Sequence, residues 1–159
     1  MEWTEENTRA VGQIIGGMYI VTAGSGDNVD GFLASWVQQA SFSPLLITIA
    51  IKPGRPCYDH IIKDKYFTLN SVGTAHSHIV KPFWKGYDPD DNPFNSLAHK
   101  ETEKGGVILN EAASALEAEV KEIYLPGDHD IVIAEVVKCH TIDKESTPMH
   151  HIRKSGLSY

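Results

Sequence analysis

The sequence contains few cysteines and no long hydrophobic run. Only Cys57 and Cys139 are cysteines among its 159 residues, and they do not form the Cys-x-x-Cys pair typical of zinc knuckles and redox dithiols. No stretch approaches the roughly 20 apolar residues that a membrane helix needs, and the opening MEWTEENTRA is acidic, unlike the basic start of a signal peptide. We therefore expect ordinary thiols, no membrane partner and a cytoplasmic location.

Positive charge is also scarce. The chain has 14 Lys and Arg against 21 Asp and Glu, and its formal net charge is −7. Because phosphate contacts need clustered cations, and the cations here are dispersed among acids, we expect no nucleic-acid partner. A chain of 159 residues that is 42% hydrophobic is long enough for one sizeable core and too short for two ordinary domains. The sequence therefore predicts a single domain over residues 1–159.

Short strand-like segments make up most of the chain. The segment 32–51 is typical of two strands that meet at Ser43 and Pro44. In the segment 115–125, apolar residues alternate with Glu117, Glu119 and Lys121, which indicates a strand with one solvent-exposed face. Further strands are expected in MYIVTAG, YFTLNSV and IVIAEVVKCHTI. We predict a mainly β fold, a small antiparallel barrel whose closure removes exposed strand edges.

Helices are expected to be few and short. One should lie in EENTRAVGQIIGG, where Gly16 and Gly17 would stop it, and another should begin near Pro56, because proline is tolerated in a first helical turn. The segment 76–106 is polar and rich in turn-forming residues, so we expect a long surface excursion with at most a turn of helix around 78–83.

Four segments carry a resemblance to a known family. These are GFLASWVQQASFSPLLITIAIK with its Ser-Phe-x-Pro break, KYFTLNSV, GDHDIVIAEV and the ending HHIRKSGLSY. In order and spacing, over roughly residues 10 to 159, they resemble the flavin reductase-like, FMN-binding split β-barrel family. The module of this family in cyanobacterial flavodiiron proteins is especially similar, although here it would stand alone. The resemblance implies a homodimer that holds FMN near the subunit interface, with NAD(P)H as electron donor.

Two positions depart from the family pattern. Leu33 stands where the family often has a threonine, so a hydroxyl contact is absent there, and Leu45 replaces the second residue of a double proline. The backbone path stays compatible with the family at both positions, and the change concerns individual flavin contacts.

The resemblance also implies which residues bind the cofactor. An FMN site needs an aromatic or apolar wall for the ring and cations for the phosphate. The flavin ring and ribityl chain would be lined by Ser35, Trp36, Ala40 and Ser41, and the phosphate would face Lys52 and Arg55. Without the resemblance, the small residues would simply permit packing within a barrel strand, and the two cations would be solvated at its end.

Two further positions are candidates for flavin chemistry. Asn70 interrupts an apolar strand, and its amide needs hydrogen-bond partners, which flavin polar atoms or neighbouring backbone could supply. His129 follows Gly127 and Asp128 in a turn, where its imidazole could help to place nicotinamide or to protonate reduced flavin; a purely structural role is the alternative.

The chain has eight histidines, but no metal site is expected from them. His76 and His78 have strand-like spacing, and His150 adjoins His151. Because HExxH is absent and no carboxylate ligand can be paired with these histidines from the sequence, we expect them to be solvent-exposed and to bind no metal.

Three functions follow from these features. The first is an FMN-binding flavin reductase that uses NAD(P)H to reduce flavin and passes electrons to an unknown acceptor. The second is an FMN-containing electron-transfer protein that a protein partner reduces, which suits the acidic net charge. The third is a barrel without flavin that serves as a structural or interaction module.

Overall fold

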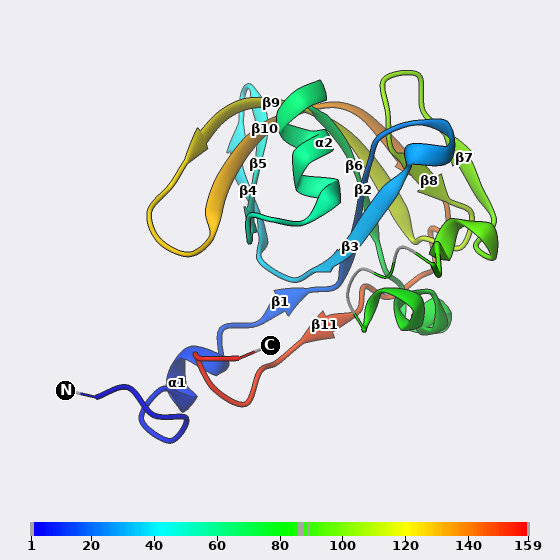
Figure 1. Cartoon of the computed structure of the whole chain (residues 1–159). Helices are drawn as coiled ribbons and strands as arrows, with labels where there is room; N and C mark the ends of the chain where they lie inside the picture. The colour runs from blue at the N-terminus through cyan, green and yellow to red at the C-terminus, as the bar shows by residue number, and fades with distance from the viewer. Residues whose placement is uncertain (1, 86–87, 89, 159) are drawn as a thin grey trace.

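The protein is built on one curled antiparallel sheet of seven strands, seen in a computed structural model that describes residues 2–85, 88 and 90–158 (Figure 1). Its strand order is β3-β2-β6-β9-β10-β5-β4. The strands are β2 (Tyr19–Ala23), β3 (Asp30–Ala34), β4 (Val37–Phe42), β5 (Leu45–Ile51), β6 (Tyr66–Ser71), β9 (Ser114–Tyr124) and β10 (Asp130–Thr141). The mainly β architecture predicted from the alternating segments is confirmed.

The sheet is an open barrel, because its two edge strands are consecutive in the chain but are not hydrogen-bonded to each other. β3 ends at Ala34 and β4 starts at Val37, so Ser35 and Trp36 carry the chain from one edge to the other. The sequence predicted one strand up to the break at Ser43 and Pro44. That prediction was wrong, since the segment forms two strands, β3 and β4, which are separated at Ser35 and Trp36.

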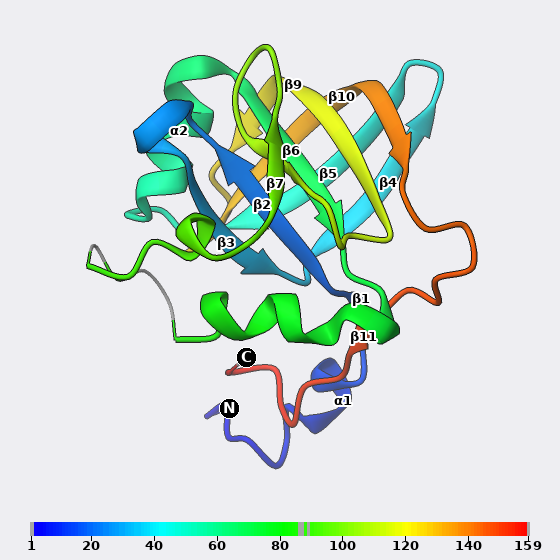
Figure 2. The same cartoon turned by 90° about the vertical axis from the view of Figure 1, so that its right-hand side faces the viewer.

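A first hydrophobic core fills the inside of the barrel. Val21, Phe67, Ile49 and Val132, from β2, β6, β5 and β10, are completely buried in it. The helix α2 (Pro56–Asp64) packs on β2, β3 and β6 and buries Ile61 in the same core. Helix α2 begins at Pro56, as predicted, and lies across one opening of the barrel (Figures 1 and 2).

A second core lies on the outer side of β2, beneath the segment that was expected to be a surface excursion. The 3₁₀ helix η2 (Thr74–Phe83) buries Ile79 and Phe83, and η3 (Pro93–Asn95) buries Phe94. The ribbon of β7 (His99–Glu101) and β8 (Val107–Leu109) completes this layer. The helical turn expected around 78–83 lies within η2, whereas the expected surface excursion over 76–106 is corrected for the described residues, because their few apolar side chains face the barrel. Residues 86, 87 and 89 of this segment lie outside the described residues.

Both chain ends form an arm that projects from the barrel (Figure 1). It contains α1 (Arg9–Gly12) and the pair β1 (Gly16–Gly17) and β11 (His150–His151). The two glycines therefore pair with β11 and do not end the helix, which corrects the prediction. Ile14 and Ile15, about two-thirds exposed, lie on this arm. Among the described residues, the short η1 (Gly26–Asn28) is the remaining helical element.

One residue predicted on the wet face of β9 is buried. Glu117 is only 6% exposed, because Tyr66 of β6 and His140 of β10 cover its carboxylate and bond to it. Both cysteines are free, Cys57 buried and Cys139 exposed. None of the described helices is long and apolar enough to cross a membrane.

Candidate functional site

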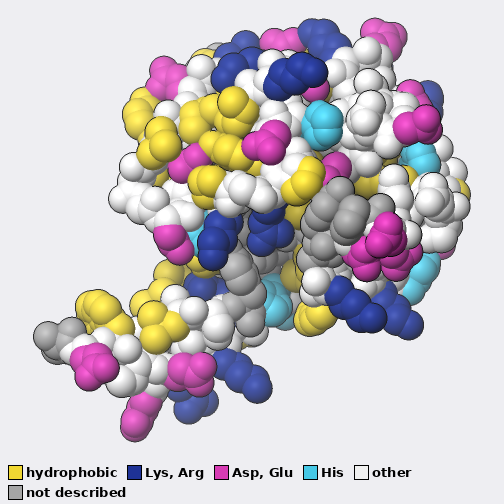
Figure 3. Space-filling model, viewed as in Figure 1, with side chains coloured by type: hydrophobic (Ala, Val, Ile, Leu, Met, Phe, Trp, Pro, Cys, Tyr) yellow, Lys and Arg dark blue, Asp and Glu magenta, His cyan; other side chains and the backbone are white. Residues whose placement is uncertain are grey.

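A cavity of about 250 Å³ lies where the chain crosses between the two edges of the barrel. Its walls come from the β3–β4 crossing, the end of β5, the end of η2 and the arm. The lining residues are Met18, Phe32, Leu33, Ala34, Ser35, Trp36, Ala50, Ile51, Lys52, Arg55, Phe83, Trp84 and His151. Figure 3 shows Lys and Arg side chains at the hollow between the barrel and the arm. The cavity is therefore apolar on several sides and cationic at one end.

Ser35 and Trp36 were predicted at a flavin site, and both line this cavity. The β1 strand passes very close to them, since a Cβ on Gly16 would lie 2.3 Å from the Ser35 carbonyl oxygen. Only glycine fits at this crossing. The Trp36 carbonyl accepts a hydrogen bond from the Ala50 amide at 3.0 Å, which holds the crossing against β5.

Lys52 and Arg55, the predicted phosphate residues, lie together on the turn between β5 and α2 and also line the cavity. Gly54 gives this turn its left-handed backbone, with φ at +86°. The guanidinium carbon of Arg55 lies 5.4 Å from the centre of the Phe32 ring, a cation–π contact that holds the side chain at the cavity wall. Helix α2 begins directly after Arg55, so the positive end of its dipole adds to the two charges.

His129, the predicted catalytic residue, packs against Trp36. Their ring centroids are 4.8 Å apart at 53°, and the imidazole side chain is only 11% exposed. Arg153 lies over the same indole, with its guanidinium carbon 5.0 Å from the ring centre. Asp128 bonds to the His129 Nδ1 at 3.0 Å. This bond, with the positive charges of His129 and Lys52, lowers the pKa of the Asp128 carboxyl.

Three predicted contact residues lie elsewhere. Ala40 and Ser41 are on the edge strand β4, outside the lining of the cavity, where the pairing register shifts at Ala40 and Ser41 lies opposite Leu46. Asn70 is completely buried between β2 and β8. Its side chain donates to the carbonyls of Ile20 and Val107, and its Oδ1 accepts from the Leu109 amide at 2.9 Å. For Asn70, backbone groups supply the partners that we considered as an alternative to flavin.

Several lining residues escaped the sequence-based prediction. Phe83 and Trp84 belong to the polar segment, and their adjacency in KPFWK was the only local sign that it reaches a pocket. His151 was noted only as part of the family ending, and it reaches the cavity because β11 pairs with β1 through Gly16. These contacts depend on segments that are distant in sequence, so local patterns could not reveal them.

The arrangement suits a flat, partly apolar ligand that carries negative charge. Phe32, Ile51 and Trp36 offer apolar and aromatic surface, while Lys52 and Arg55 offer charge-assisted hydrogen bonds at one end. The donor set therefore fits a flavin nucleotide.

Comparisons with known proteins identify the family of the chain. The model of the flavin reductase like domain family matches residues 11–156. Diflavin flavoprotein A 1 of Synechocystis sp. is 34% identical over 152 residues, which cover 95% of this chain and 26% of that protein. The chain thus spans about a quarter of the length of the curated relatives it matches.

Solved structures show the same fold. The NADH:FAD oxidoreductase of Streptomyces globisporus superposes with a TM-score of 0.81 at 22% identity, covering 91% of this chain and 86% of that one. Flavin reductase HpaC, solved with NADP+, has a TM-score of 0.81 at 20% identity and covers 95% of both chains. The split-barrel fold implied by the resemblance is confirmed, and the chain belongs to the flavin reductase-like domain family.

Proposed function

We propose that the cavity binds FMN and that the protein is an NAD(P)H-dependent flavin oxidoreductase. The observation that carries the proposal is the pair Lys52 and Arg55 at one end of a cavity whose other walls are largely apolar. A flavin nucleotide has the matching distribution, with a flat ring at one end and a phosphate at the other. The solved relatives named as an NADH:FAD oxidoreductase and as a flavin reductase with NADP+ support the choice of nicotinamide as donor.

The residues of the cavity would divide the binding. Lys52 and Arg55 hold the phosphate, and the indole of Trp36 with Ser35 borders the ring. When bound, FMN supplies a hydride acceptor that a nicotinamide can reduce and that an electron acceptor can reoxidise. His129, behind Trp36 and bonded to Asp128, keeps the indole in place and can exchange a proton near the site. Ala40 and Ser41 remain predicted contacts.

The proposal is tested by titrating FMN into the purified protein and following the flavin absorbance and fluorescence. Arg55→Ala should weaken FMN binding, because a hydrogen bond to a charged group contributes about 1.5–3 kcal/mol, which corresponds to roughly 10- to 150-fold in Kd. Lys63→Ala, an exposed cation in the last turn of α2, is the matched control and should bind FMN as the wild type does.

The reductase activity is measured separately, as oxidation of NADH and of NADPH by the FMN-loaded protein. A rate above that of free flavin is expected with one of the two nucleotides. Equal binding of FMN by wild type and Arg55→Ala would refute the assignment of the cavity, and a rate no higher than free flavin with both nucleotides would refute the reductase.

A second candidate function is electron transfer with a protein partner as the reductant. The curated relatives are named diflavin flavoproteins, and this chain spans about a quarter of their length, which supports a function in which the flavin receives electrons from another protein or domain. The net charge of −7 suits docking to a basic partner. Stopped-flow mixing of the FMN-loaded protein with NAD(P)H distinguishes the two, since absent bleaching of the flavin favours this second function.

We also propose that the single domain works as a homodimer. The cavity of about 250 Å³ is smaller than the roughly 300–1,000 Å³ of most ligand sites, so a second copy would complete its wall. Phe42 is 90% exposed and Leu125 76% exposed at strand ends, and Ile14 is 68% exposed on the arm. Light scattering should give twice the mass of 17.6 kDa, and a monomer mass in the presence of FMN would refute the dimer.

A cytoplasmic location stays a prediction from the sequence.

A further inference from the structure

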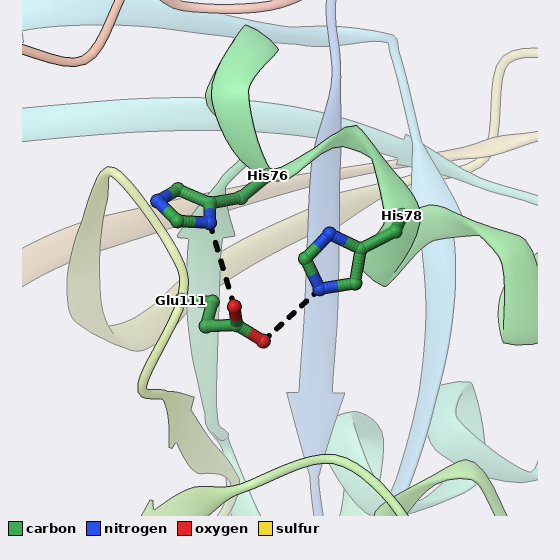
Figure 4. Close-up of side chains that lie close together, drawn as sticks. All are labelled: His76, His78 and Glu111. Atoms are coloured by element: carbon green, nitrogen blue, oxygen red, sulfur yellow. Dashed lines mark hydrogen bonds and ion pairs between the residues drawn. The ribbon is translucent and has the colours of Figure 1, made fainter.

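A second cluster of chemically active side chains lies outside the cavity, at the start of η2. His76 and His78 come from the first turns of η2, and Glu111 comes from the turn between β8 and β9. Figure 4 shows the Glu111 carboxylate between the two imidazoles. The Nδ1 atom of His76 lies 3.5 Å from one carboxylate oxygen, and the Nε2 atom of His78 lies 3.0 Å from the other.

We propose that His76, His78 and Glu111 form a binding site for one divalent transition-metal cation of the zinc class. The three ligand atoms all lie within 4.8 Å of one another. Bonds of about 2.0–2.2 Å from zinc to nitrogen and oxygen place tetrahedral ligands roughly 3.3–3.6 Å apart. The cluster therefore needs only small side-chain rotations to enclose a cation.

The backbone on both sides of the cluster is held by the second core. On η2, Ile79 and Val80 follow the histidines directly and are buried. At the β8–β9 turn, Leu109 and Ala112 flank Glu111, are almost fully buried, and are joined by a hydrogen bond from the Ala112 amide to the Leu109 carbonyl at 3.1 Å. The ligands are thus positioned by packing, which reduces the entropy lost when a cation binds.

The side chains themselves remain open to solvent. His76 is 32% exposed, His78 59% and Glu111 47%, so a cation can enter and water can fill its remaining position. Two imidazole nitrogens and one carboxylate oxygen favour zinc, nickel, cobalt or copper over magnesium and calcium, which prefer all-oxygen sites. The proposal departs from the expectation that these histidines bind no metal, because Glu111 is 33 residues away from His78 in sequence and is paired with it only by the fold.

A cation at this site would tie the beginning of η2 to the β8–β9 turn. η2 is kinked at His76, where the backbone is not helical (φ −118°, ψ 30°), and the part after the kink carries both His78 and, at its end, Phe83, which lines the cavity. The proposal does not rest on the identity of the ligand in that cavity.

The test is titration of Zn²⁺ into the metal-free, full-length chain, followed by calorimetry and by thermal unfolding. One Zn²⁺ per chain and a higher unfolding temperature are expected for the wild type. Loss of a residue that only supports a metal ligand lowers metal affinity roughly 10- to 100-fold. Because His78→Ala and Glu111→Gln remove ligands themselves, their affinity for Zn²⁺ should fall by at least that much. His150→Ala removes an exposed histidine outside the cluster and is the matched control, which should bind as the wild type does.

The outcomes separate this site from unspecific binding to histidines. Loss of Zn²⁺ affinity in both ligand variants, with the control unchanged, supports the proposal. Equal affinity in wild type, His78→Ala and Glu111→Gln overturns it, as does a wild type that retains no Zn²⁺ on dialysis. Circular dichroism of each variant shows whether a loss of affinity comes with a loss of fold, and a loss confined to unfolded variants also counts against the site.

Discussion

Glu117 offers a sharp test of how the barrel is held together. Its carboxylate is buried in β9, accepts a hydrogen bond from the Tyr66 hydroxyl, and lies 2.7 Å from the His140 Nε2 and 3.7 Å from the Lys138 Nζ. Burial by itself raises the pKa of Glu117. The bonds from Tyr66 and His140, with the positive charges of Lys138 and His140, outweigh that effect and leave the pKa lowered. The charged form is thus preferred in the folded state.

The change Glu117→Gln keeps the shape of the side chain and removes its charge. Hydrogen bonds to a charged group contribute about 1.5–3 kcal/mol each and neutral ones about 0.5–1.5, so we expect the free energy of unfolding to fall by about 2 kcal/mol at pH 7. For a chain of 159 residues, that corresponds to a decrease of about 4–8 °C in Tm. Thermal unfolding followed by circular dichroism measures the difference.

The pH dependence of this difference distinguishes charge from shape. Because the folded-state pKa of Glu117 lies below its ordinary value of 4.5, the stabilisation is fully present above pH 4.5 and is lost as the pH falls through the folded-state pKa. The Tm gap between wild type and Glu117→Gln should therefore narrow in acid. Glu119→Gln is the control, since this more exposed residue of the same strand pairs only with surface lysines and should change Tm little. A gap that is equal at pH 7 and pH 3, or equal effects of the two variants, would refute the reasoning.

Two further predictions concern polar groups near the site. Asn70→Ala removes three buried hydrogen bonds to the backbone and should lower the free energy of unfolding, measured by urea denaturation, by at least about 1–3 kcal/mol. The affinity for FMN should stay unchanged. A loss of FMN affinity without a loss of stability would instead show that Asn70 contacts the flavin. Burial and the bond to Asp130 raise the pKa of Tyr58 to about 12 from its ordinary 10.0, so the stabilisation that Tyr58 contributes should be constant below pH 10 and fall as the pH rises from 10 towards 12. Alkaline absorbance titration should show less tyrosine ionisation near pH 12 in Tyr58→Phe than in the wild type. Tyr66, whose pKa is also raised, contributes equally to both proteins, so an unchanged amplitude in Tyr58→Phe would contradict the assignment.

Much of the framework was predictable from local patterns. The strands at 19–23, 66–71 and 114–124 coincide closely with segments selected for β-branched residues and alternation, and α2 begins at the predicted Pro56. Of the predicted cofactor residues, Ser35, Trp36, Lys52 and Arg55 meet at one cavity. Ser35 and Trp36 lie on the β3–β4 crossing, and Lys52 and Arg55 lie on the turn after β5. The β4–β5 hairpin between them folds back so that the Trp36 carbonyl meets the Ala50 amide, which brings the two pairs together.

The errors share a physical cause. Glu117 alternates like a solvent-facing residue, yet His140 and Tyr66 from neighbouring strands cover it. The segment 76–106 has few apolar residues, yet Phe83 and Phe94 are placed to bury against the barrel. In each case the environment of a side chain depends on strands that are far away in the sequence. The periodicity of a single segment carries no information about which distant strands will cover it.

The sequence by itself determined the class of fold and the family, because alternation, turn residues and the segments from Gly31 to Lys52 and from Gly127 to Val136 are local features. Only the tertiary structure decided what lies opposite those segments. It placed Phe83, Trp84 and His151 around the cavity and Glu111 between His76 and His78. The reason is that sheet pairing and the packing of the two cores bring together residues that are tens of positions apart in the sequence. No local pattern specifies which distant residues meet.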